Sequence, residues 1–188
     1  DPGGVVSTVC YTGTSPRTEH SLMIDIKIDT ALNRQINIEL ASAYNYLAIE
    51  AHFALENLGG FAHWMHVQYV EEQAHAMRLF KYLIDRGGSL QLAAVAQPPS
   101  KFGTPREVFQ KALELERENT KAINELYGLA LAQKDYATMN HLNWFLDEQV
   151  EEEKIMEEVI GLLDLAGEDR SALLVLNRQM GERAAQAT

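Results

Sequence analysis

The sequence has a single cysteine, Cys10, among its 188 residues. One cysteine excludes a disulfide framework within the chain, a zinc ribbon and a cysteine-ligated iron-sulfur cluster. No apolar run approaches the ~20 residues that a transmembrane helix needs, so we expect no membrane partner. Basic residues are scarce too: 16 Lys and Arg stand against 27 Asp and Glu. The net charge of −11 argues against nucleic acid as a partner and favours solubility or cation binding.

Residues 1–24 have no helical periodicity and are rich in Gly, Ser and Thr, which predicts a flexible extension before a domain at 25–188. The sequence starts at Asp1 rather than Met. A remnant of an organellar transit peptide and an engineered segment explain this extension equally well. We expect a cytoplasmic protein, with a plastid or another organelle as the alternative.

Apolar residues recur with helical spacing over 29–57 and again over 61–86. Asp29 is the expected N-cap of the first helix, and Gly59-Gly60 is its expected stop. Because the turn between them is so short, the two helices must be antiparallel neighbours.

The next segment, 89–103, contains Pro98-Pro99 and has no sustained period, so it is predicted to be a linker. A linker of this length can extend to ~50 Å. A helix of about 27 residues is ~40 Å long, so the linker can run the length of the bundle. We expect it to place the start of the third helix at the end of the bundle where the first helix starts.

Thr104, Pro105 and Glu107 form a capping-box start for a third helix over 105–132. Asp135 can cap a fourth helix that continues to about residue 165, and a short fifth helix is expected over 169–180. These elements predict an all-α bundle of two helical hairpins joined by one long crossover, with a short C-terminal helix.

Each long helix carries an acidic residue inside an apolar row. Glu39 interrupts the row of the first helix, and Glu116 that of the third. The rows are Leu32, Ile36, Ala43 and Leu47 in the first helix, and Phe109, Ala112, Ile123 and Ala130 in the third. A carboxylate in an apolar row is costly unless something pairs with it.

The other two helices each carry a polar pair at i, i+3 spacing, which places both side chains on one face. Glu72 and His75 form this pair in the second helix, and Gln149 and Glu152 form it in the fourth. Their apolar neighbours are Met65, Leu79 and Leu83 in the second helix, and Leu142, Phe145, Met156, Val159 and Leu163 in the fourth.

Together these residues form a pseudo-twofold pattern, since 33 residues separate Glu39 from Glu72 and 36 separate Glu116 from Glu152. We expect both halves to deliver ligands to the same level of the bundle. Any one of them is readily explained as a charge at the margin of the core. Taken together, their carboxylates would repel strongly at low dielectric unless cations lie among them. Oxygen ligands with one imidazole suit iron or manganese, and bridging carboxylates place two ions close enough to act jointly.

Four motifs give the sequence a family resemblance: LNRQINIELASAYNYL, VEEQAHAMRLFKYL, KAINEL and NWFLDEQVEEEK. Through them, residues 25–183 resemble the ferritins, and the non-haem ferritins of bacteria more than those of animals. The resemblance implies the ferritin-like four-helix bundle with its short fifth helix. It also implies iron as the bound metal.

The resemblance assigns roles by position. It implies that Glu39, Glu72 and His75 hold the first iron of a ferroxidase centre, and that a bridging Glu72, Glu116 and Glu152 hold the second. Gln149 matches a glutamine that hydrogen-bonds near the two irons. A third, inner iron site would use Glu71, Glu148, Glu151 and Glu152. Tyr46 matches a tyrosine beside the centre and Trp144 a recurrent aromatic, although core packing explains both equally well.

Two departures narrow the resemblance. Gln73 stands where bacterioferritins have a methionine that ligates haem, so no haem is expected. The absence of Cys-x-x-Cys excludes rubrerythrins.

The resemblance implies a ferroxidase that oxidises Fe(II) with O2 or H2O2 and stores a ferric mineral inside a hollow shell of 24 subunits. The alternatives are another diiron oxidase or oxygenase on the same bundle, a shell subunit that nucleates mineral without oxidising iron, and a plain interaction bundle.

Overall fold

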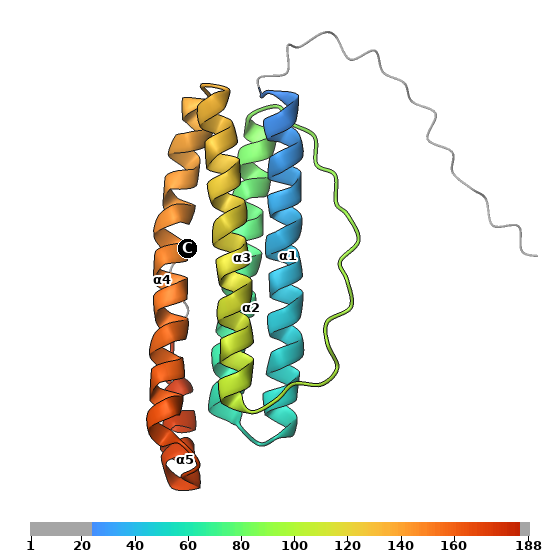
Figure 1. The fold of residues 1–188 in the computed structure, drawn as a ribbon. Helices are drawn as coiled ribbons and strands as arrows, with labels where there is room; N and C mark the ends of the chain where they lie inside the picture. Colours follow the sequence, from blue (N-terminus) through green and yellow to red (C-terminus); the bar gives the residue numbers. More distant parts are fainter. Residues whose placement is uncertain (1–23, 185–188) are drawn as a thin grey trace, which may run out of the picture.

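A computed structural model describes residues 24–184, and within them four long helices and one short helix account for the regular structure. The helices are α1 (Ile26–Leu55), α2 (Gly59–Asp85), α3 (Pro105–Ala132), α4 (Tyr136–Ala166) and α5 (Arg170–Met180). α1 packs along α2 and α3 along α4, and α5 contacts α2 and α4 (Figure 1). The predicted all-α bundle with its short fifth helix is confirmed.

The predicted extension at residues 1–24 lies outside the described residues except at its last position. Ile24 is only 2% exposed and packs in the core with Ile28 and Leu83. The organellar alternative also depends on this undescribed segment, and it stays a prediction.

The crossover between α2 and α3 runs the length of the bundle, as predicted (Figure 1). Our expectation for the start of α3 was wrong, however. α2 ends beside the start of α1, so a full-length crossover brings α3 to the opposite end, where α1 finishes. The contacts show this directly: His52, near the end of α1, lies 3.3 Å from the carbonyl oxygen of Gly103. α3 is therefore antiparallel to α1.

The helix starts follow their capping residues, with one correction. The backbone N–H of Glu107 donates to the Thr104 hydroxyl, and the Glu107 carboxylate accepts from the Thr104 N–H, which confirms the capping box. Asp135 caps α4 as predicted. Asp29 does not cap α1; Asp25 does, because α1 begins a turn earlier. Asp29 is buried instead, and it accepts a hydrogen bond from the backbone of Ser89, which ties α1 to the crossover.

The turn between α1 and α2 also differs from the prediction. Asn57, with φ of 61°, makes the left-handed turn, while Gly59 is already the first residue of α2. Gly60 is required for another reason. A Cβ added there would lie 1.5 Å from the carbonyl oxygen of Asn177, so glycine is what allows α5 to pack against the start of α2.

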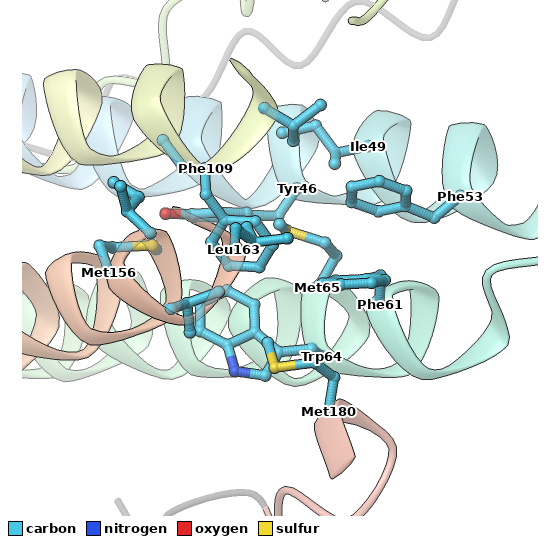
Figure 2. Packing of buried hydrophobic residues seen from close by; sticks show 14 of the residues in the cluster. Tyr46, Ile49, Phe53, Phe61, Trp64, Met65, Phe109, Met156, Leu163 and Met180 are labelled. Atoms are coloured by element: carbon cyan, nitrogen blue, oxygen red, sulfur yellow. The ribbon is translucent and has the colours of Figure 1, made fainter. Parts of the chain in front are cut away.

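Two apolar clusters fill the bundle, one toward each end. One gathers around Phe53, Phe61 and Phe109 and includes Trp64 and Met156 (Figure 2). The other contains Ile28, Leu32, Leu79, Leu83, Ile123, Leu126, Leu142 and Phe145. Burial of each such side chain contributes about 1.5–3 kcal/mol. The apolar rows predicted for the four helices are buried, apart from Leu47 at 39% exposed; its neighbour Tyr46 turns inward instead.

Candidate metal centre

A layer of buried polar side chains separates the two apolar clusters. In α2, α3 and α4 the residues of one cluster stop about one turn before the layer and those of the other resume about one turn after it, whereas in α1 they resume two turns after Glu39, at Tyr46. The layer contains Glu39, Gln68, Glu71, Glu72, His75, Glu116, Asn119, Gln149 and Glu152, and none of these is more than 3% exposed. The prediction that all four helices deliver polar groups to one level of the bundle matches this arrangement.

On the α1/α2 side, Glu39, Glu72 and His75 bring three ligand atoms within 4.8 Å of one another. Nδ1 of His75 lies 3.8 Å from Oε2 of Glu72 and 4.0 Å from Oε2 of Glu39. These separations exceed a hydrogen bond, and Oε2 of Glu72 is buried with no hydrogen-bond partner in residues 24–184. A buried carboxylate oxygen without a partner, beside an imidazole nitrogen, is well suited to a metal ion.

The protonation states on this side follow from burial. Burial raises the pKa of Glu72 well above its ordinary value, and the charges of Glu116 and Glu39 raise it further. Burial lowers the pKa of His75, which keeps the imidazole neutral, the form that ligates metals. A divalent ion would remove the repulsion that holds the Glu72 proton on.

Two amides orient Glu39. Gln35 Nε2 donates to Oε1 of Glu39 at 2.7 Å and to Oδ1 of Asn119 at 2.6 Å. Asn119 Nδ2 in turn donates to Oε2 of Glu39 at 3.2 Å. Both oxygens of Glu39 therefore accept hydrogen bonds from neutral amides, which fix the orientation of the carboxylate.

On the α3/α4 side, the acidic groups are already hydrogen-bonded. The Tyr46 hydroxyl donates a short hydrogen bond to Oε1 of Glu116. Gln149 Nε2 lies 3.4 Å from Oε2 of Glu116 and 3.2 Å from its backbone oxygen. Glu152 accepts from Gln68 Nε2 at 2.9 Å. Tyr46 and Gln149, which the resemblance placed near the two irons, both contact Glu116.

Burial is also the largest cause of the raised pKa values of Glu116 and Glu152. It raises the pKa of Glu116 to about 7, against the opposing hydrogen bonds from Tyr46 and Gln149. It raises the pKa of Glu152 to about 8, helped by the charge of Glu116. The same burial, together with Glu116, keeps the pKa of Tyr46 well above its ordinary value. Without a metal, this layer holds protons near neutral pH.

The residues predicted for the inner iron site are not uniform. Glu71 is buried and its Oε2 accepts from Arg183 at 2.8 Å. Glu148 is half-buried, and burial with the charges of Glu151 and Glu71 raises its pKa. Glu151 is exposed. These carboxylates therefore run from the buried layer out to the surface between α2 and α4.

Trp144 lies beside the centre, with its ring 5.3 Å from the His75 ring in an edge-to-face arrangement. The guanidinium carbon of Arg78 lies 4.1 Å from the centroid of the Trp144 ring. Trp144 thus packs the histidine in place, which is consistent with the packing role that we left open for it.

Sequence reasoning missed four residues that touch the layer: Gln35, Gln68, Asn119 and Arg183. Gln35 and Gln68 each precede a predicted ligand, Glu39 or Glu72, by four residues, so helical spacing could have found them. Arg183 could not have been found in this way, because it lies 112 residues from Glu71.

Among the described helices, none is both long and apolar enough to cross a membrane.

Comparisons with known proteins agree with this architecture. A family model for the ferritin-like domain matches residues 30–166. The bacterial non-heme ferritin of Staphylococcus aureus (strain USA300) is 38% identical over 161 residues, covering 86% of this chain and 97% of that protein. The bacterial non-heme ferritin of Bacteroides fragilis (strain 638R) is 37% identical over 161 residues, covering 86% of this chain and all of that protein.

Solved structures give the same result. A crystal structure of an open-pore ferritin from the hyperthermophilic archaeon Archaeoglobus fulgidus superposes with a TM-score of 0.84 at 44% identity, covering 86% of this chain and 99% of that one. An engineered closed form of the Archaeoglobus fulgidus ferritin gives 0.85 at 44% identity, with 87% and 99% covered. The chain therefore belongs to the ferritin family and folds as a ferritin-like domain.

Proposed function

We propose that this protein is a ferroxidase that stores iron: it binds two Fe(II) ions as substrate in the polar layer, oxidises them and passes the ferric product to a mineral. The observation that carries the proposal is the group Glu39, Glu72 and His75. Its ligand atoms converge within 4.8 Å, all three side chains are buried, and Oε2 of Glu72 makes no hydrogen bond to any described residue.

The second iron would take Glu116 and Glu152, with Glu72 bridging the two ions. Both of these residues hold protons near neutral pH, with pKa values of about 7 and about 8. Binding of the second iron therefore releases protons. Because Glu116 must also leave Tyr46 and Gln149 at least in part, the two irons have unequal sites.

The reaction balances with either oxidant. Two Fe(II) ions give one electron each to O2, which takes up two protons and leaves as H2O2. With H2O2 as oxidant, the same two electrons and two protons break the O–O bond and yield two waters. The chain supplies the geometry, the amide donors that orient Glu39, and an apolar cluster on each side of the layer that limits the escape of reactive oxygen.

A mineral store requires an enclosure, so we propose a closed homo-oligomer, with 24 subunits as the family resemblance implies. Apolar side chains on the outer faces of the helices support assembly. The most exposed are Ile26, Leu55, Tyr136, Val150, Leu165, Leu174 and Val175. Leu174 and Val175 lie on α5, which packs against the bundle through its other face, where Leu176 and Met180 are buried.

The test is stopped-flow oxidation. The full chain is loaded with two Fe(II) per subunit without oxygen, mixed with O2, and followed by its absorbance. We expect Glu72→Gln to slow the fast phase by more than the about 10- to 100-fold typical of outer hydrogen-bonding partners, because Glu72 contacts both irons. The matched control is Glu118→Gln, which neutralises an exposed carboxylate on α3.

Two outcomes would contradict the proposal. Slow oxidation in the unmodified protein that does not change with Glu72→Gln would indicate an inert shell subunit. A particle that stays the size of one or two chains in native mass spectrometry would indicate a bundle enzyme without a store.

A further inference from the structure

The segment that follows α5 brings a positive charge into the bundle. Arg183 lies three residues beyond Met180, the last residue of α5, and only 13% of its side chain is exposed. Its Nη2 donates a 2.8 Å hydrogen bond to Oε2 of Glu71. Its guanidinium carbon lies 4.3 Å from the centroid of the Trp64 ring. Both partners belong to α2, so the C-terminal segment is held against the inner carboxylates rather than in solvent.

The base of this segment is fixed. Oδ1 of Asn177 accepts from the backbone N–H groups of Gly60 at 3.0 Å and Phe61 at 3.1 Å, so α5 caps the first turn of α2. Met180 is buried in the same apolar cluster as Trp64 (Figure 2). Beyond that point, His63 contacts the carbonyl oxygen of Arg183 at 2.9 Å. A few residues could therefore move Arg183 while α5 stays in place.

Arg183 is incompletely satisfied where it lies. Its Nη1 is buried without a hydrogen-bond partner among the described residues, and so is Oε1 of Gln68. The other end of Gln68 donates to Glu152. The Arg183 charge also opposes the burial that raises the pKa of Glu152. The guanidinium thus donates a hydrogen bond to Glu71 and stabilises the charged form of Glu152, while its Nη1 makes no hydrogen bond to the described residues.

We propose that Arg183 is the resident cation of these inner carboxylates, and that a metal ion binding between Glu71 and Glu152 must displace it. The inference rests on the proposed function. A guanidinium has only donors and a permanent positive charge, so it cannot share two carboxylates with a metal ion without strong repulsion. Binding of an inner metal is therefore coupled to movement of the C-terminal segment.

The competition between Arg183 and a metal ion for these carboxylates depends on the charge of the ion. A trivalent ion is attracted to two carboxylates more strongly than a divalent ion at the same distance. Fe(III) made at the centre therefore displaces Arg183 more readily than Fe(II) does. Arg183 keeps Fe(II) at the oxidation site and yields the inner carboxylates to the product.

The first test is a calorimetric titration of the full chain with Zn²⁺, a redox-inert divalent probe. We expect Arg183→Gln to tighten the binding of a third Zn²⁺ per subunit by at least about tenfold, within the usual range of coupling between sites. Arg183→Lys keeps the positive charge, so its affinity for the third Zn²⁺ should lie between those of the unmodified protein and Arg183→Gln. Arg178→Gln is the matched control, because it removes one exposed positive charge from α5 and should leave the titration unchanged.

The second readout is Trp64 fluorescence. In a Trp144→Phe background Trp64 is the remaining tryptophan, since the sequence has two. The third Zn²⁺ should change its emission while Arg183 is present and leave it unchanged in Arg183→Gln. Equal titrations of Arg183→Gln and the unmodified protein, or an emission that never responds, would overturn the inference. Such results would leave the proposed function standing if Glu72→Gln still abolished fast oxidation.

Discussion

The two sides of the polar layer differ in how ready they are for metal. On the α1/α2 side, Glu72 and His75 approach without hydrogen-bonding, and Oε2 of Glu72 has no hydrogen-bond partner in the part of the chain that the structure describes. On the α3/α4 side, Glu116 is bonded to Tyr46 and Gln149, and Glu152 to Gln68. The sequence pattern is nearly twofold, but the geometry is not.

This difference indicates an order of binding. An ion on the α1/α2 side meets a Glu72 oxygen that no other described group uses and a neutral imidazole, while the amides of Gln35 and Asn119 hold Glu39 in place. An ion on the α3/α4 side must first displace the hydrogen bonds that Glu116 and Glu152 already make. Both sides release protons on binding, because burial raises the pKa of Glu72 as well as those of Glu116 and Glu152. We therefore expect the first metal to bind at Glu39, Glu72 and His75, and the second to bind more weakly.

The largest effect should come from removing the imidazole. His75→Ala deletes a ligand of the first site, and we expect the first Zn²⁺ to bind more weakly by about 100-fold or more, beyond the range typical of outer-partner losses. Glu152→Ala removes the residue at the equivalent position of the other half, and it should weaken the second Zn²⁺ while leaving the affinity of the first unchanged. Calorimetry under identical buffer conditions measures both.

His66→Ala is the control for the first variant, since His66 lies on α2 with about half of its side chain exposed. The proposed order would be wrong if Glu152→Ala cost the first ion as much affinity as His75→Ala does. Circular dichroism of each variant checks that the helices remain.

The first half of the layer could be predicted from the sequence, because its ligands come from helical spacing. Glu72 and His75 are three residues apart on one helix, so the helical period alone predicted that they lie on the same face. The direction of α3 was not obtained, because it depends on which end of the bundle the crossover reaches. The position of Arg183 could not be predicted either, because it also depends on tertiary packing: the packing of α5 at Gly60 places Arg183 beside Glu71.

The acidic residues on the α3/α4 side of the layer should make the free energy of unfolding of the metal-free protein depend on pH. The pKa of Glu116 is raised from 4.5 to about 7 in the folded chain, so the folded state binds more protons than the unfolded state between these values. Its contribution is fully present below pH 4.5 and is lost as pH rises through about 7, at roughly 1.4 kcal/mol per pH unit in between. Glu152 extends the decline to about pH 8.

Glu116→Gln replaces the titrating carboxyl group with an amide that does not titrate. In urea unfolding of the metal-free chain, we expect this variant to lose less stability between pH 5 and 7 than the unmodified protein, because Glu116 no longer titrates while Glu72 and Glu152 still do. Zn²⁺ at pH 8 should restore stability to the unmodified protein, because it binds the folded state. Identical pH profiles for Glu116→Gln and the exposed-site variant Glu118→Gln would contradict this account.

The smallest effect should come from the tyrosine between the halves. Tyr46 belongs to α1, yet its hydroxyl donates to Glu116 of α3. Tyr46→Phe should cost the metal-free protein about 1 kcal/mol, the net value of one hydrogen bond. It should change the affinity of the second Zn²⁺ by less than about fivefold, under ~1 kcal/mol, because a bound ion replaces the hydroxyl as the partner of Glu116.

Tyr44→Phe is the matched control, since Tyr44 is 47% exposed on the same helix. A loss of second-site affinity in Tyr46→Phe as large as that in Glu116→Gln would show that the hydroxyl itself ligates the ion. A slower oxidation at unchanged Zn²⁺ affinity would instead place Tyr46 in electron transfer, since the hydroxyl would then matter only when iron gives up its electrons. Stopped-flow oxidation and calorimetry on the same protein preparations separate these two results.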